Sequence, residues 1–144
     1  TVLRGENAKE VTVTATRDTV QAQTIEYKLM DDKIGYIRVS EFDTVTYDQY
    51  EEALDDLEKQ GMTGLVVDLR NNPGGSLSTV CDMLDLMLPK GLIVYTEDKD
   101  GKKTEMKSDE EHQFTKPLAV LVNGNSASAS EIYSGAIQDY GIKT

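Results

Sequence analysis

Two short runs of apolar residues constrain the fold more than any other feature of this 144-residue sequence. Residues 64–69 read GLVVDL and residues 117–122 read PLAVLV. Runs of this length without polar alternation are typical of strands that are buried on both faces of a sheet. Because a helical pattern follows each run, the sequence indicates an α/β fold with parallel strands.

The segments around these two runs predict further strands. Alternating apolar residues predict a strand over residues 11–15, after the turn-forming segment RGENAKE. The same alternation predicts a hairpin in which residues 25–29 and 34–39 pair around the turn DDK. Another hairpin is predicted at the Asp-Gly pair 100–101, because this dipeptide favours the tight turn between antiparallel strands.

Apolar residues three and four apart predict three helices. The first begins at Thr46, where Gln49 completes a capping box, and it ends at Gly61. The second covers residues 77–88 and is followed by proline and glycine. The third follows the second apolar run. No internal repeat or flexible linker interrupts this pattern, so we expect one main domain.

Charge and the scarcity of reactive side chains exclude several functions. The formal net charge is −11, which argues against general nucleic-acid binding because contacts to phosphate need basic residues. Cys81 is the only cysteine and His112 the only histidine, so the sequence offers no disulfide framework and no cysteine-rich or histidine-rich metal site. We expect a buried thiol at Cys81, a solvated imidazole at His112, and neither a metal nor a cofactor.

The two apolar runs end in loops made of small residues. PGGS occupies residues 73–76 and NSASAS occupies residues 125–130. Because ligands of open α/β sheets gather beyond the carboxyl ends of the strands, we expect these loops to meet at one site. Backbone N–H groups at a glycine turn and at a helix start can face a developing negative charge. An ordinary turn and ordinary helix caps are the alternative explanation.

Several segments together resemble one family. IGYIRVSEFD at 34–43, GLVVDLRNNPGG at 64–75, LPKG at 88–91 and VNGNSASASEI with GAIQDYG at 122–141 are similar to the carboxyl-terminal processing, or tail-specific, serine proteases. The resemblance implies an α/β spiral core like that of crotonases and Clp proteases, incomplete at its C-terminus. It implies that residues 1–20 are the remnant of a preceding PDZ domain and that residues 21–144 form part of the peptidase core.

The resemblance also implies roles for single residues. It makes Ser128, the middle serine of SASAS, the nucleophile, with Ser126 and Ser130 as neighbours that shape the turn. The backbone N–H groups of Ala129 and of the glycine pair would form the oxyanion hole, Gly74 being preferred to Gly75.

Two acids match family positions as well. Glu131 and Asp139 are assigned possible supporting roles, and Asp139 is supportive at most because an acid late in a helix usually faces water.

The family uses a Ser–Lys dyad, in which a lysine of lowered pKa takes the proton of the serine. The resemblance places this lysine beyond Thr144 and does not assign the role to Lys143. We therefore expect these 144 residues alone to be inactive, and to self-associate through an uncovered sheet edge. Protein or peptide substrates with apolar C-terminal tails also follow from the resemblance alone. So does a location in the cell envelope or elsewhere outside the cytoplasm, with a membrane anchor in the full-length protein.

Two other functions stay open at this point. A non-catalytic peptide-binding or scaffold domain could keep the same fold without activity. A crotonase-type acyl-CoA enzyme would share the paired backbone donors, but it needs no serine at the turn, so the SASAS segment counts against it.

Overall fold

The structure, a computed structural model, describes residues 2–4, 9–14, 16, 21–109 and 111–142. Its elements are, in chain order, β1 (Val2–Arg4), β2 (Lys9–Val11), β3 (Ile25–Leu29), the short 3₁₀ turn Asp31–Lys33, β4 (Ile34–Val39), α1 (Thr46–Lys59), β5 (Gly64–Asp68), α2 (Leu77–Asp85), β6 (Gly91–Glu97), β7 (Lys103–Ser108), β8 (Leu118–Leu121) and α3 (Ala129–Asp139).

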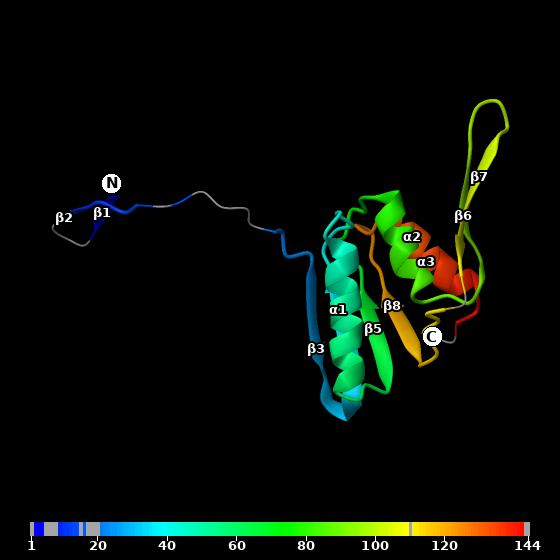
Figure 1. Cartoon of the computed structure of the whole chain (residues 1–144), viewed down its shortest axis with the longest axis horizontal. Coiled ribbons are helices and arrows are strands. Elements are labelled where there is room, and N and C mark those ends of the chain that lie inside the picture. Colours follow the sequence, from blue (N-terminus) through cyan, green and yellow to red (C-terminus); the bar gives the residue numbers. More distant parts are fainter. Residues whose placement is uncertain (1, 5–8, 15, 17–20, 110, 143–144) are drawn as a thin grey trace.

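A four-stranded sheet in the order β3-β4-β5-β8 forms the centre of the molecule (Figure 1). β3 and β4 are antiparallel, as the predicted hairpin requires. β4, β5 and β8 are parallel, with Ile37 opposite Val67 and Val67 opposite Val120. The prediction of parallel strands is therefore confirmed, and the carboxyl ends of β5 and β8 lie side by side.

The two apolar runs differ in burial, which corrects one expectation. In β5 and just after it, Leu65, Val67 and Leu69 are fully buried. In β8, Ala119 and Val120 are only half-buried. β8 is an edge strand among the described residues, so no further strand covers its outer side.

The helices and the sheet enclose one apolar core. α1 packs over β3 and β4, and α2 contacts both α1 and α3, an arrangement visible in Figure 1. The core side chains that the helices contribute include Tyr50 and Leu57 from α1, Leu84 from α2 and Tyr133 from α3. On the opposite face of the sheet, Arg38 is exposed.

The start of α1 differs from the predicted capping box. The residue before α1 makes no side-chain capping bond. The Thr46 hydroxyl is instead buried and accepts the Asp43 N–H at 2.9 Å. The Gln49 side-chain oxygen accepts the Thr24 N–H at 3.0 Å, so this glutamine holds the start of β3 on the helix. Tertiary hydrogen bonds have taken the place of the local cap.

Two other boundaries are corrected. α2 ends at Asp85 rather than near residue 88, because the Leu86 carbonyl accepts the N–H of Phe114 at 3.1 Å instead of continuing the helix. The strand expected over residues 11–15 lies at β2, where Val11 pairs with Val2 of β1. Residues 12–14 have no regular secondary structure, and residue 15 is outside the described residues.

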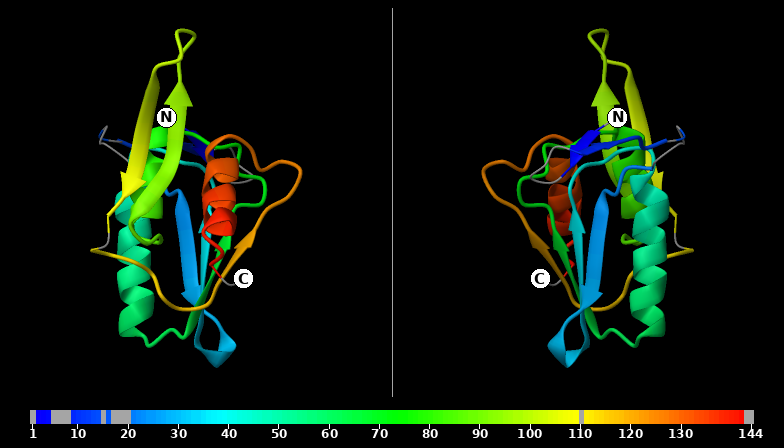
Figure 2. Two further views of the ribbon diagram at one scale, coloured as in Figure 1. Left: turned by 90° about the vertical axis from the view of Figure 1, so that its right-hand side faces the viewer. Right: turned by 90° about the vertical axis from the view of Figure 1, so that its left-hand side faces the viewer.

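The predicted Asp-Gly hairpin is present and projects from the body of the molecule. β6 and β7 pair with each other (Figure 2). At the tip, Gly101 has a φ of 80° and the Asp98 carboxylate accepts the N–H groups of Asp100 and Lys102. In the described part of the chain no helix is both long and apolar enough to cross a membrane.

Candidate active site

The glycine loop and the serine loop are in direct contact. They follow β5 and β8, which are parallel neighbours, and so leave the sheet at the same edge. A Cβ atom placed on Gly74 would lie 2.7 Å from the Ser128 Cβ and 2.8 Å from the Ala127 carbonyl oxygen. Only glycine fits at this distance. The structure therefore brings together the two loops that the sequence predicted would meet.

Ser128 has an unusual backbone conformation. It is the residue before α3 and has φ 54° and ψ −115°. Ser128 is exposed to solvent. A positive φ is rare for a residue with a side chain and costs free energy, so it persists only where the surroundings hold it. A strand, a sharp turn and a helix, with an exposed serine at the turn, form the arrangement of a nucleophile elbow.

Glu131 helps to hold this conformation. Its carboxylate accepts the Ser128 N–H at 2.8 Å, and its own N–H donates to the Ser128 carbonyl at 2.9 Å. An acidic side chain in the first turn is also favoured by the helix dipole. Asp139, by contrast, lies at the other end of α3, roughly 16 Å away at 1.5 Å per residue, so it cannot contact Ser128.

The hydrogen bonds of the two neighbouring serines distinguish them from Ser128. The Ser126 hydroxyl donates to the Leu69 carbonyl at 2.7 Å. The Ser130 hydroxyl is fully buried and donates to the Asn72 carbonyl at 3.0 Å. Both hydroxyls therefore hold the serine turn against the glycine loop, while Ser128 is the exposed member of the three.

Backbone donors of the expected kind surround Ser128. The Ala129 N–H is the first of α3, and a helix has no acceptor of its own for it. The Gly74 N–H donates to the Asn72 side-chain oxygen at 2.8 Å, whereas the Gly75 N–H has no hydrogen-bond partner among the described residues. Of this glycine pair, the Gly75 N–H is therefore the one left free for a ligand, whereas the resemblance preferred Gly74.

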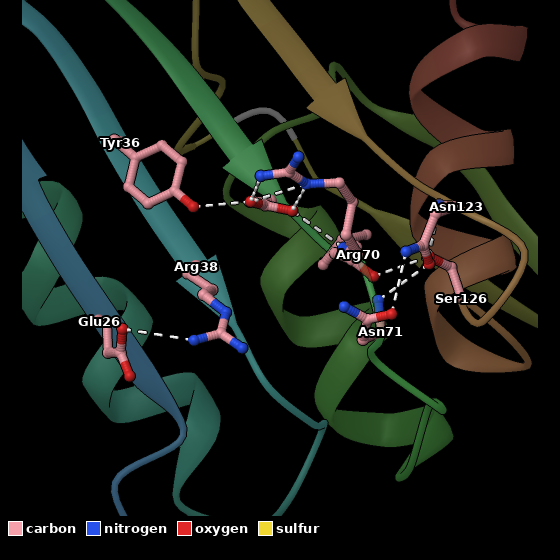
Figure 3. Close-up of polar contacts among 9 residues, drawn as sticks. Glu26, Tyr36, Arg38, Arg70, Asn71, Asn123 and Ser126 are labelled. Carbon is pink, nitrogen blue, oxygen red and sulfur yellow. Dashed lines mark hydrogen bonds and ion pairs between the residues drawn. The ribbon is translucent and has the colours of Figure 1, made fainter.

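Asparagine side chains join the outer parts of the two loops (Figure 3). The Asn71 N–H donates to the Asn123 side-chain oxygen at 3.0 Å. The side-chain amides of Asn123 and Asn125 both donate to the Asn71 side-chain oxygen. Sequence analysis missed this contact, because asparagines in RNNPGG and NGNS are explained equally well as turn residues.

A buried carboxylate stands at the base of the glycine loop. Asp68, the last residue of β5, accepts hydrogen bonds from the Arg70 guanidinium at 2.6 Å and from the Tyr36 hydroxyl at 2.6 Å (Figure 3). The Arg70 guanidinium and the Tyr36 hydroxyl lower the pKa of this carboxyl well below its usual range, although burial opposes the shift. Burial and the hydrogen bond to Asp68 raise the pKa of Tyr36. This network fixes the first residues of the loop.

The only histidine lies elsewhere. His112 lines a hollow with Leu54 and Leu86, beside α1. Its imidazole and the carboxylates of Asp109 and Glu111 lie within 4.8 Å of one another. All three residues are exposed, and exposed acidic groups often lie close together without an ion, so we assign no metal there.

Comparison with known proteins identifies the family. The model of peptidase family S41 matches residues 33–144. This chain belongs to peptidase family S41. The carboxyl-terminal-processing protease of Synechocystis sp. is 42% identical over 130 residues, which cover 88% of this chain and 30% of that protein. The carboxy-terminal processing protease CtpA of Bacillus subtilis is 40% identical over 124 residues, or 85% of this chain and 27% of that protein.

Solved structures agree with this membership in S41. The photosystem II D1 C-terminal processing protease superposes with a TM-score of 0.73 at 30% identity, covering 86% of this chain and 36% of that one. The resemblance to tail-specific proteases and the predicted α/β fold are thus confirmed. The S41 chain described here spans less than a third of the length of the two curated relatives.

Proposed function

We propose that the full-length protein is a serine endopeptidase that cleaves proteins near their C-terminal tails, with Ser128 as its nucleophile. The observation that carries this proposal is the exposed Ser128 at φ 54°, pressed against the glycine loop and followed by a free helix N-terminus. Strained backbone conformations of this kind cluster at active sites, which supports a catalytic role for this serine, although serine is also a favoured residue at a helix start.

The geometry supports acyl transfer. The Ser128 Oγ attacks the carbonyl carbon of the scissile peptide bond as its proton passes to a base, giving a tetrahedral oxyanion. The N–H groups of Ala129 and Gly75 then donate to that oxygen. The intermediate expels the amine, which takes a proton, and leaves an acyl-enzyme on Ser128. Water hydrolyses the ester and restores the serine.

The proposed base is a lysine of lowered pKa from a part of the protein outside these 144 residues. Two observations support an external base. The only histidine in the sequence, His112, lies beside α1, and the Glu131 carboxylate already accepts the Ser128 N–H. We therefore propose that the 144-residue chain alone is inactive.

Further proposals concern the substrates, the cellular location and the assembly of this S41 protein. Relatives are named for carboxyl-terminal processing, which supports substrates with accessible C-terminal tails, and we propose that apolar tails are preferred. We propose a cell-envelope location and a PDZ origin for residues 1–20, within which β1 and β2 pair with each other. We also propose that the isolated chain self-associates through the edge of β8.

Peptide cleavage by the full-length protein tests the proposal. Ser128→Ala is expected to lower kcat by about 10⁴-fold or more, as removal of a serine nucleophile does in serine proteases. Ser134→Ala is the matched control, because its hydroxyl donates to the Ser130 carbonyl within α3 at 2.9 Å and it should leave kcat unchanged. Peptides with apolar and acidic C-terminal residues measure the tail preference.

Cleavage that persists in Ser128→Ala would show that the proposed function is wrong. A non-catalytic peptide-binding domain predicts a different result, namely peptide binding without any hydrolysis by the wild-type full-length protein.

A further inference from the structure

Asn72 is a fully buried polar residue in the loop between β5 and α2, at 0% exposure. Its side-chain amide donates to the Val39 carbonyl at 2.9 Å, and its side-chain oxygen accepts the Gly74 N–H at 2.8 Å. Its backbone carbonyl accepts the Ala127 N–H at 3.1 Å and the Ser130 hydroxyl at 3.0 Å. The bonds to Val39, Gly74 and Ser130 are buried.

These bonds join three segments that are distant in the sequence. Val39 ends β4, Gly74 belongs to the glycine loop, and Ala127 and Ser130 flank the nucleophile. A buried amide or carbonyl that loses its partner costs free energy, so the hydrogen bonds of Asn72 stabilise one arrangement of all three segments against the alternatives. Asn72 thus contributes to the position of the serine turn relative to the glycine loop, together with the Ser126 and Asn71 bonds.

The bond to Gly74 also determines which N–H groups can meet a substrate. Because the Gly74 N–H is taken by Asn72, its peptide plane is fixed and the next N–H, that of Gly75, stays free. The position that a Cβ of Gly74 would occupy is 3.0 Å from the Ala129 nitrogen. The two free donors, Gly75 and Ala129, therefore belong to adjoining stretches of backbone.

We propose that Asn72 is the positioning residue of the oxyanion site: it holds Gly74 so that the Gly75 N–H, and not the Gly74 N–H, acts together with the Ala129 N–H. The inference rests on the proposed function, since it assigns a role within the same reaction. Asn72 itself does not contact the substrate. It acts by keeping the donors at the distance that the developing oxyanion requires.

Steady-state kinetics of the full-length protein on a peptide substrate test this role. Asn72→Ala is expected to lower kcat by about 10²–10³-fold, the range seen when one oxyanion donor is lost. KM should stay within about twofold, because the donors act on the transition state rather than on the bound peptide. A residue that only supported the fold would lower the fraction of folded enzyme, so kcat is calculated per folded molecule and would then equal the wild-type value.

Ser130→Ala is a milder variant that keeps the inference testable if Asn72→Ala does not fold. It removes one hydrogen bond to Asn72, and alanine is favourable within a helix. We expect kcat to fall about tenfold at unchanged KM. Ser108→Ala is the control, because it removes a comparable bond from a buried hydroxyl to the Pro89 carbonyl, away from both loops, and should leave kcat unchanged.

Wild-type kcat in Ser130→Ala, or in a folded Asn72→Ala, would overturn the inference. Ser128→Ala is measured in parallel, because it tests the proposed function separately from the role of Asn72. If Ser128→Ala is inactive while the Asn72 and Ser130 variants keep full kcat, only the role of Asn72 is wrong. If Ser128→Ala stays active, the proposed function fails, and the inference fails with it.

Discussion

At the scale of single residues, the site depends on backbone conformations that most side chains do not allow. Ser128 has a positive φ, and Gly74 beside it has a φ of 106°. The backbone strain at Ser128 costs of the order of 1–3 kcal/mol. The hydrogen bonds of Glu131 to the Ser128 backbone help to offset this cost. Strain and close contact together make this pair of positions sensitive to substitution.

Gly74→Ala is therefore expected to abolish peptide cleavage by the full-length protein. The new methyl group would lie 2.7 Å from the Ser128 Cβ, so either the serine turn or the glycine loop must move. Gly135→Ala is the matched control, since no atom lies within 4 Å of a Cβ there and alanine should stabilise α3 by up to about 1 kcal/mol. Equal activity of the two variants would contradict the contact between the loops.

The buried Asp68 predicts a dependence of stability on pH. Its pKa is lowered in the folded state, whereas an unfolded aspartate titrates near about 3.9. The contribution of Asp68 to the free energy of unfolding is thus present above about pH 4. It is lost as pH falls below that value towards the pKa of the folded state. Asp68→Asn should cost about 2 kcal/mol at neutral pH and flatten the acid dependence of the free energy of unfolding, measured with urea.

Glu26→Gln is the control for this measurement. Its ion pair with Arg38 spans 3.6 Å on the surface, and exposed pairs contribute little. An acid dependence in Asp68→Asn identical to that of the wild type would contradict the assignment of the buried carboxylate.

Periodicity and strand order were sufficient to place both loops at one sheet edge, whereas the choice of Ser128 came from the resemblance and stays a prediction. The sequence could not identify Asn72. An asparagine before proline is an ordinary turn residue, and which peptide N–H it accepts depends on loop torsions that appear only once β4, β5 and the serine turn are assembled.

At the scale of elements, a buried pair of hydroxyl groups joins α1 and α3. The Tyr50 and Tyr133 hydroxyl groups lie 2.8 Å apart, and the Tyr50 hydroxyl also donates to the Met87 sulfur at 3.3 Å. Both side chains are fully buried, and burial raises the pKa of each phenol. Because α3 begins next to Ser128, this pair also anchors the helix that carries the site.

Tyr50→Phe should destabilise the protein by about 1–3 kcal/mol, because it leaves the Tyr133 hydroxyl buried without its partner. Tyr133→Phe should cost less, because the Tyr50 hydroxyl keeps its bond to the Met87 sulfur. The double variant should cost less than the sum of the two, since no polar group is then left unpaired. Additive costs in a urea-unfolding cycle would show that the two hydroxyl groups do not interact.

Predictions of elements from the sequence succeeded where the pattern was local. The helices, the parallel strands and the Asp-Gly hairpin each follow from periodicity or turn chemistry. The capping box at Thr46 failed because Thr46 and Gln49 bond instead to residues near β3, a tertiary contact that no local rule contains. The predicted burial of residues 117–122 was wrong because a local pattern does not show whether a strand lies at the edge of its sheet.

At the scale of the whole molecule, the edge of β8 is the feature that bears on assembly. β8 and β3 are the outer strands of the central sheet as described. Val122 follows β8 and is 49% exposed. It lines a groove of about 560 Å³ together with Val120 and Ile137. An edge strand with exposed apolar side chains can pair with a second copy.

Val122→Lys should weaken self-association of the 144-residue chain, because a charge at a sheet edge opposes pairing. Val13→Lys introduces the same change at another exposed valine, outside the central sheet, and should have no effect. Sedimentation velocity across a range of concentrations measures both. A wild-type chain that stays monomeric throughout would contradict the proposed self-association.

The central claim is that Ser128, among the clustered serines, is the nucleophile. Its most direct test is to treat the full-length protein with a fluorophosphonate, which reacts with activated serines, and to map the modified residue by mass spectrometry. The structure predicts a single adduct on Ser128, because the hydroxyl groups of Ser126 and Ser130 hold the turn in place. An adduct on Ser126 or Ser130, or peptide cleavage that continues once Ser128 is fully modified, would contradict the claim.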